Sequence, residues 1–173
     1  MNDQEKYKYA YALTSVASTG LSFVEDSLTS IMNDKTDLAW LRSFYILLSY
    51  NFELILKSRI TMVEGFTDKQ ALNNRLVQLG HDIQAIKNAL GKTHLEEIGI
   101  NNIEKNTQYK ISAIDGKEVL IEDFTKIRYD FLNNIVRSVD SQEHTRIKGY
   151  LDVLFSILQK AKEKNEEAKG QAA

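Results

Sequence analysis

The chain has 173 residues, no cysteine, and 22 Lys and Arg residues against 24 Asp and Glu, which gives a formal net charge of −2. This length favours one domain over residues 1–173, and the missing cysteine excludes disulfides, zinc–thiolate sites and cysteine nucleophiles. The near-zero charge excludes a whole-surface electrostatic attraction to nucleic acid, although a local basic groove stays open.

The sequence carries no signal for export or for insertion into a membrane. Its first five residues are polar and acidic, whereas an export signal begins with basic and then apolar residues. The most apolar run, 38–60, is interrupted by five polar or charged residues that would be costly in hydrocarbon. We therefore expect a cytoplasmic protein that makes no contact with a membrane.

Apolar residues at steps of three and four predict a series of amphipathic helices. The first covers Lys6 to Met32, and Gly20 beside its apolar stripe would let a neighbouring helix approach closely. The second covers about Asp37 to Val63 and is apolar on most sides, so it belongs in the middle of the fold. A third runs to about Leu90, and its continuity across Gly80 is left open.

The next stretch favours β-structure, because two runs of β-favouring residues flank Asp115-Gly116. This pattern predicts a small β-hairpin insertion at about 107–122. Two further helices begin after Asp123 and Asp140, and from about 162 the charged sequence predicts a solvated C-terminal tail. The expected fold class is mainly α, an up-and-down bundle of four or five helices with the hairpin inserted.

Three histidines are the natural candidates for acid–base work or metal binding: His81, His94 and His144. A helical di-metal site would place a glutamate three residues before each one, but Gln78, Gly91 and Ser141 stand there. The His-Glu-x-x-His, phosphate-loop and nucleophile-elbow patterns are also absent. The sequence therefore predicts no metal and no cofactor.

Two charged residues of the central helix, Glu53 and Lys57, stand at i and i+4 in the favourable order. Residues at this spacing share a helix face. An internal ion pair that orders the helix is the favoured interpretation, with a ligand site as the alternative.

Three short segments, taken in order, resemble the HEPN superfamily of prokaryotic helical bundles. They are the helix with Glu53-x-x-x-Lys57, the tripeptide Gly80-His81-Asp82, and a segment with Arg128-Tyr129. The resemblance spans about 38–158 and implies a four- or five-helix bundle that usually pairs as a homodimer. Members of the family are either metal-independent ribonucleases or non-catalytic binding modules, many of them in defence, toxin–antitoxin or stress loci.

The ribonucleases of this family carry an arginine, usually followed by a polar residue, and then a histidine after four to six intervening residues. The histidine can move a proton while the arginine steadies charge on the phosphate. After Arg128, Asn133 and Asn134 stand where the histidine is needed, so the motif is broken there. Elsewhere the spacing is met by Arg137 with His144 and by Arg75 with His81.

The leading hypothesis is a non-catalytic HEPN-like binding module for a nucleotide, an RNA or a partner protein. Its ligand-binding residues are expected to be His81, Asp82, Arg128, Tyr129 and Asn134. Packing and salt-bridge roles for Arg128 and Tyr129, and a solvated or cap-bonded His81, are the simpler competing interpretations.

Two alternatives stay open. One is a metal-independent ribonuclease that uses Arg137 and His144 paired across a dimer interface. The other is a purely structural interaction domain, whose hairpin at 107–122 adds to the sheet of a partner protein.

Overall fold

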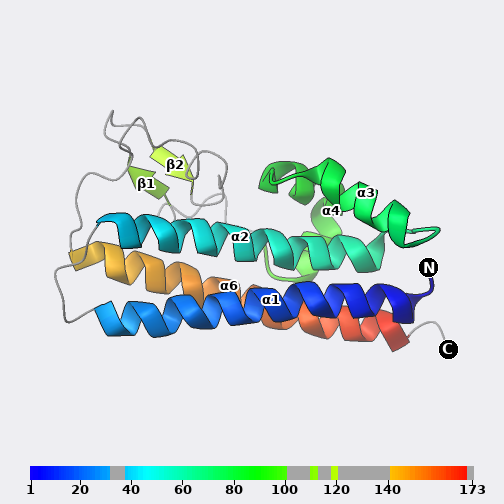
Figure 1. The fold of residues 1–173 in the computed structure, drawn as a ribbon, viewed down its shortest axis with the longest axis horizontal. Coiled ribbons are helices and arrows are strands. Elements are labelled where there is room, and N and C mark those ends of the chain that lie inside the picture. Colours follow the sequence, from blue (N-terminus) through cyan, green and yellow to red (C-terminus); the bar gives the residue numbers. More distant parts are fainter. Residues whose placement is uncertain (32–37, 101–109, 113–117, 121–140, 171–173) are drawn as a thin grey trace.

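The fold is a bundle of helices built around α2. The structure, a computed structural model, describes residues 1–31, 38–100, 110–112, 118–120 and 141–170. Within these residues it has five helices: α1 (Asp3–Ile31), α2 (Leu38–Val63), α3 (Lys69–Leu79), α4 (Ile83–Glu97) and α6 (Ser141–Gly170). Figure 1 shows α1, α2 and α6 side by side, with α1 antiparallel to the other two, and with α3 and α4 beside one end of α2. The prediction of a mainly helical bundle is confirmed.

Two short strands also lie within the described residues. Strand β1 (Lys110–Ser112) pairs antiparallel with β2 (Glu118–Leu120), with Lys110 opposite Leu120. The connection between them, their flanks and the helix expected after Asp123 lie outside the described residues. The hairpin insertion at 107–122 therefore stays a prediction.

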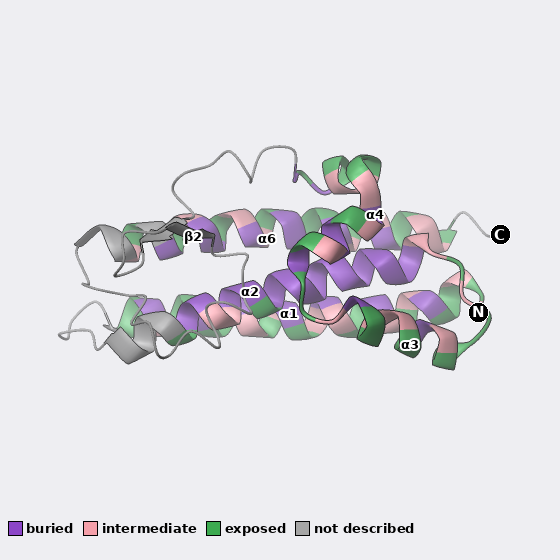
Figure 2. Cartoon of the chain, turned by 90° about the horizontal axis from the view of Figure 1, so that it is seen from above, coloured by how far each residue is buried: buried purple, intermediate pink, exposed green. Residues whose placement is uncertain are grey.

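The centre of the bundle is the second half of α2, where every residue from Asn51 to Met62 is buried. Helices α1, α6 and α4 pack against different sides of this stretch (Figure 2). Full burial of a single Leu, Ile or Phe side chain contributes about 1.5–3 kcal/mol, so this helix carries much of the apolar stabilisation. Among the described residues, no helix combines the length and the apolar character needed to cross a membrane.

Helix α1 approaches α2 closely at Gly20, where the sequence predicts a close contact with a neighbouring helix. A Cβ atom at Gly20 would lie only 2.8 Å from Cγ of Asn51. The Asn51 amide is itself held in place, because its Nδ2 donates to the Leu47 carbonyl at 2.8 Å. The glycine is therefore required by the space between the two helices.

The helical structure is interrupted at Gly80, so the third predicted helix consists of two helices, α3 and α4. Gly80 ends α3 with φ 58°, a value in the left-handed region, and its N–H donates to the Val77 carbonyl at 3.0 Å. The Asp82 side chain then accepts from Ala85 N at 3.0 Å and caps α4. The third helix is predicted to end at about Leu90, but α4 continues to Glu97 with a kink at Gly91.

The C-terminal segment differs from its prediction. Helix α6 continues to Gly170, and Asn165 is buried against α2. Its Oδ1 accepts from Arg59 Nη1 at 2.9 Å, and its Nδ2 donates to Ser58 Oγ at 3.2 Å. The segment predicted as a solvated tail from about 162 is therefore helical to Gly170 and attached to α2 through Asn165, while its other side chains are exposed or half-buried. A buried amide with buried polar partners replaces the apolar stripe, and such a contact leaves no periodic signal in the sequence.

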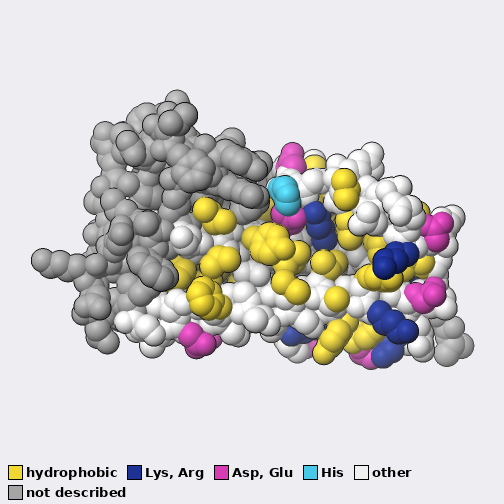
Figure 3. All heavy atoms as spheres, viewed as in Figure 1, with side chains coloured by type: hydrophobic (Ala, Val, Ile, Leu, Met, Phe, Trp, Pro, Cys, Tyr) yellow, Lys and Arg dark blue, Asp and Glu magenta, His cyan; other side chains and the backbone are white. Residues whose placement is uncertain are grey.

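Large apolar side chains also lie on the outer surface of the bundle. On α1, Val16 is 53% exposed and Phe23 is 55% exposed, and Tyr50 on α2 is exposed as well. Figure 3 shows hydrophobic side chains over α1 and α2 on the face of the molecule that is also toward the viewer in Figure 1.

We predict that Gly20→Ala destabilises the fold by about 1–3 kcal/mol, because the added methyl overpacks the contact with Asn51. This loss outweighs the gain of about 1 kcal/mol in helix propensity. Gly149→Ala on α6 is the matched control, since a Cβ there meets nothing within 4 Å. Urea unfolding measures both variants, and equal stability changes would contradict the close approach.

Candidate functional site

The candidate site is centred on Glu53, a carboxylate of α2 that is only 2% exposed. Lys57 Nζ lies 2.8 Å from Glu53 Oε1, which is the pairing that their spacing predicts. The same ammonium donates to the Gly80 carbonyl at 2.6 Å. The buried ion pair therefore also holds the break between α3 and α4 against the central helix.

His81 is the third member of this cluster. Its Nδ1 lies 3.0 Å from Glu53 Oε2 and 3.2 Å from Oε1, and its side chain is 49% exposed. An ionised carboxylate only accepts hydrogen bonds, so Nδ1 carries the proton. In neutral imidazole the other nitrogen, Nε2, is then an acceptor, and in imidazolium it is a donor. Glu53 thus fixes both the orientation and the tautomer of a half-exposed ring.

The charge of the cluster depends on His81. The opposite charges of Glu53 and Lys57 cancel, so a protonated His81 gives the cluster a net charge of +1. The glycine of the Gly-His-Asp tripeptide supplies the break and a carbonyl, and Asp82 caps α4. This geometry places one half-exposed imidazole at the surface with its orientation fixed by a buried carboxylate.

Most of the other predicted site residues lie outside the part of the chain that the structure describes. Arg128, Tyr129, Asn134 and Arg137 lie outside the described residues. His144 is half-buried in the first turn of α6, and among the described residues its buried Nε2 has no hydrogen-bond partner. The pairing of Arg137 with His144 therefore stays a prediction.

Arg75, the other arginine with the ribonuclease spacing, is held away from this cluster. Its Nε lies 2.9 Å from Glu64 Oε2 and its Nη2 lies 2.8 Å from Glu64 Oε1. The hydrogen bonds with Glu64 raise the pKa of the Arg75 guanidinium. Arg75 and His81 are therefore bound by two different carboxylates, so their spacing in the sequence does not reflect a shared site.

A second polar cluster, around Arg59, has no counterpart in the sequence predictions. Arg59 is buried, and its Nη2 lies 2.9 Å from Glu97 Oε2 at the end of α4. Burial lowers the pKa of Arg59. His94 Nδ1 lies 3.1 Å from the same Glu97 oxygen, and this hydrogen bond, together with the charges of His94 and Arg59, lowers the pKa of Glu97.

The contact between Arg59 and Asn165 completes the cluster, which joins α2, α4 and α6. Its only signal in the sequence is an arginine near the end of a mostly apolar helix. The partners stand 38 and 106 residues away, so periodicity within one helix cannot identify them.

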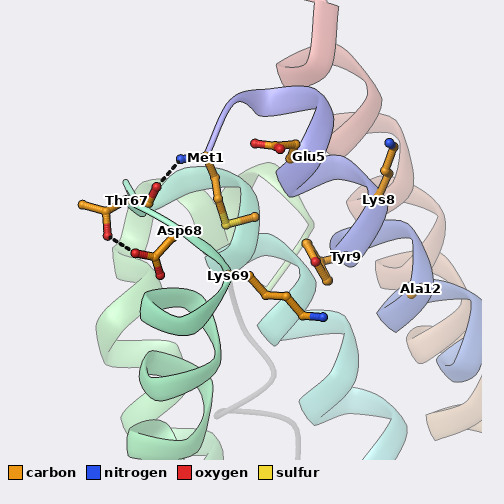
Figure 4. Close-up of a pocket in the computed structure, with 8 residues that line it drawn as sticks. All are labelled: Met1, Glu5, Lys8, Tyr9, Ala12, Thr67, Asp68 and Lys69. Atoms are coloured by element: carbon orange, nitrogen blue, oxygen red, sulfur yellow. Dashed lines mark hydrogen bonds between the residues drawn. The ribbon is translucent and has the colours of Figure 1, made fainter.

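A cavity of about 560 Å³ lies between the start of α1 and the start of α3. Figure 4 shows its lining, in which Lys69 extends toward the ring of Tyr9, with 5.7 Å between Nζ and the ring centroid. Asp68 caps α3 by accepting from Ala71 N at 2.8 Å, which lowers its pKa. Two carboxylates and two lysines line the cavity, so its charge favours no particular ligand.

No group of three or more acidic or histidine side chains in the described part of the chain is placed to hold a metal ion. No protein-family model matches the sequence, and neither a curated protein nor a solved structure shows significant similarity to it. The resemblance to the HEPN superfamily therefore rests on the short segments quoted above and stays a prediction.

We predict that Lys57→Met destabilises the fold by about 3 kcal/mol, because it leaves the buried Glu53 without its lysine partner. Lys148→Met is the matched control: Lys148 and Asp152 form a pair of the same spacing, at 3.4 Å, on the exposed surface. Loss of that pair costs about 0.5 kcal/mol or less. Urea unfolding gives both values, and a small effect at Lys57 would contradict a buried charge pair.

We also predict a pH-dependent role for Glu97. Its pKa lies below the ordinary value of 4.5, so its stabilising effect is present above pH 4.5 and is lost as the pH falls through the lowered pKa. The stability difference between the wild type and Glu97→Gln should therefore shrink on acidification. Urea midpoints at neutral pH and at about pH 3 measure it. Glu96→Gln is the control, because Glu96 pairs with Lys92 on the exposed side at 3.6 Å.

Proposed function

We propose that the chain is a non-catalytic, HEPN-like binding module whose ligand presents a phosphate, as a nucleotide or an RNA does. The observation that supports this most is the half-exposed His81 ring, which the buried Glu53 carboxylate holds at 3.0 Å. A ring that is already oriented loses little conformational freedom when a ligand binds.

The charges of the cluster suit such a ligand. Lys57 neutralises Glu53, so the buried carboxylate does not repel an incoming anion at full strength. Protonated His81 carries a positive charge, and a hydrogen bond from a charged donor to a phosphate is about twice as strong as a neutral one. The net charge of −2 favours a small ligand or a short RNA segment over a long, purely electrostatic contact.

A binding role is favoured over catalysis because of the residues that follow Arg128. Asn133 and Asn134 stand where the ribonucleases of the family have their histidine. Arg128, Tyr129 and Asn134 are proposed to complete the site beside His81. Hydrogen-bonding amides and a guanidinium can bind a phosphate or a base edge, but an amide does not transfer protons at neutral pH.

Calorimetric titration with nucleoside triphosphates and with a short single-stranded RNA tests this function. We expect saturable binding that weakens about tenfold or more in His81→Ala, because a hydrogen bond to a charged group contributes about 1.5–3 kcal/mol. His94→Ala is the matched control, since this histidine also contacts a carboxylate, at 3.1 Å. Arg128→Ala should weaken binding without lowering the melting temperature.

Two results would overturn the proposal. One is the absence of saturable binding by the folded wild type. The other is an equal effect of His81→Ala and His94→Ala. Cleavage of mixed RNA in EDTA that disappears in His144→Ala would favour the ribonuclease alternative instead.

A further inference from the structure

The cavity between the start of α1 and the start of α3 has no role in the function proposed above. Its volume of about 560 Å³ lies within the range of about 300–1,000 Å³ that is typical of sites for small molecules. Its lining combines an apolar part, made of Met1, Tyr9 and Ala12, with two carboxylates and two lysines. Such a lining is suited to a ligand that has both an apolar body and charged groups.

The two lysines of the cavity are available to an anionic group. Neither Lys8 nor Lys69 forms an ion pair with a carboxylate among the described residues. The Lys69 ammonium lies 5.7 Å from the centroid of the Tyr9 ring, which is a weak contact that a ligand carboxylate can replace. The ammonium of Met1 is not available in this way, because it donates to two backbone carbonyls of the turn before α3, at 2.6 and 2.9 Å.

The two carboxylates of the cavity differ in what they can still bind. Both oxygens of Asp68 are occupied: Oδ1 accepts from Ala71 N at 2.8 Å and Oδ2 accepts from Thr67 Oγ1 at 3.2 Å. Glu5 is exposed, and only its Oε2 accepts a hydrogen bond within the described residues, from Asn2 N at 3.1 Å. Glu5 therefore keeps one oxygen for a cationic group of a ligand.

The available charges lie apart from each other. Figure 4 shows Glu5 and Lys69 at opposite ends of the lining, with the side chains of Met1 and Tyr9 between them in this view. A free amino acid carries its ammonium and its carboxylate on one carbon atom, whereas each added residue separates them by up to about 3.3–3.6 Å. The separation of Glu5 and Lys69 thus suits a short peptide better than a single amino acid.

We propose that the cavity binds a zwitterionic peptide of two or three apolar residues. Glu5 binds its terminal ammonium, Lys69 binds its terminal carboxylate, and its side chains lie on the apolar part of the lining. The exposed Lys8, one turn after Glu5 on α1, donates to a backbone carbonyl of the peptide. The charges of the cavity cancel in sum, so the separation of its available groups, and not a net charge, selects the ligand. This site does not depend on the phosphate-binding function proposed for His81.

An NMR titration of the full chain with the dipeptide Leu-Leu tests the site. We expect saturable shifts of the amide signals that line the cavity. Leu-Leu amide lacks the carboxylate and N-acetyl-Leu-Leu lacks the ammonium, so each should bind at least about threefold more weakly than Leu-Leu. Equal affinity for the three peptides, or the absence of saturable shifts at the cavity, would overturn the proposal.

Two variants assign the ends of the peptide. Lys69→Met should weaken the binding of Leu-Leu at least about threefold and leave the affinity for Leu-Leu amide unchanged. Glu5→Gln, which keeps an acceptor for Asn2 N, should weaken Leu-Leu and leave the affinity for N-acetyl-Leu-Leu unchanged. Lys92→Met on α4 is the matched control, because this lysine is 88% exposed and lies outside the cavity.

Equal effects of Lys69→Met and Lys92→Met on the binding of Leu-Leu would contradict the assignment of Lys69. His81→Ala should bind Leu-Leu like the wild type, because His81 does not line the cavity. A failure of nucleotide binding would therefore leave the peptide site untouched, and loss of peptide binding would not affect the function proposed for His81.

Discussion

The fold depends on satisfying the charged groups buried in the second half of α2. Glu53, Lys57 and Arg59 all lie within the stretch that is covered on every side. A buried charge without a partner costs several kcal/mol, so the surrounding elements must place polar groups against each one. His81 contacts Glu53, and the Gly80 carbonyl accepts a hydrogen bond from Lys57. Glu97 and Asn165 both accept hydrogen bonds from Arg59. These contacts fix the positions of α3, α4 and the end of α6.

The candidate site follows from the same requirement. His81 is oriented because Glu53 accepts its Nδ1–H, so the half-exposed ring lies at a junction that also holds the fold together. A substitution at Glu53 would change stability and the orientation of His81 at the same time. His81 itself lies at the surface end of the cluster. A substitution there changes the groups that the site exposes to a ligand more than it changes the packing of the core. This difference explains why functional and structural effects can be separated at His81 and not at Glu53.

The two sides of α1 illustrate how different constraints act on one helix. Its inner side packs on α2 so closely that Gly20 has no room for a side chain. Its outer side shows small and apolar residues, and no residue from 9 to 24 is charged. Solubility alone favours charged residues on such a face. The inner side of α1 is therefore fixed by its packing on α2, whereas its outer side is not constrained in this way.

The sequence by itself determined the helical class, the central place of α2, the close approach at Gly20 and the spacing that pairs Glu53 with Lys57. Each of these features has a local signal in the sequence, because the period of 3.6 residues shows which residues share one face of a helix. Only the tertiary structure decided that the chain breaks at Gly80, that His81 contacts Glu53, and that Arg59 contacts Glu97 and Asn165. The helical continuation to Gly170 and the burial of Asn165 were missed for the same reason. Contacts between polar groups 28 to 106 residues apart depend on how helices pack, and no local pattern encodes that packing.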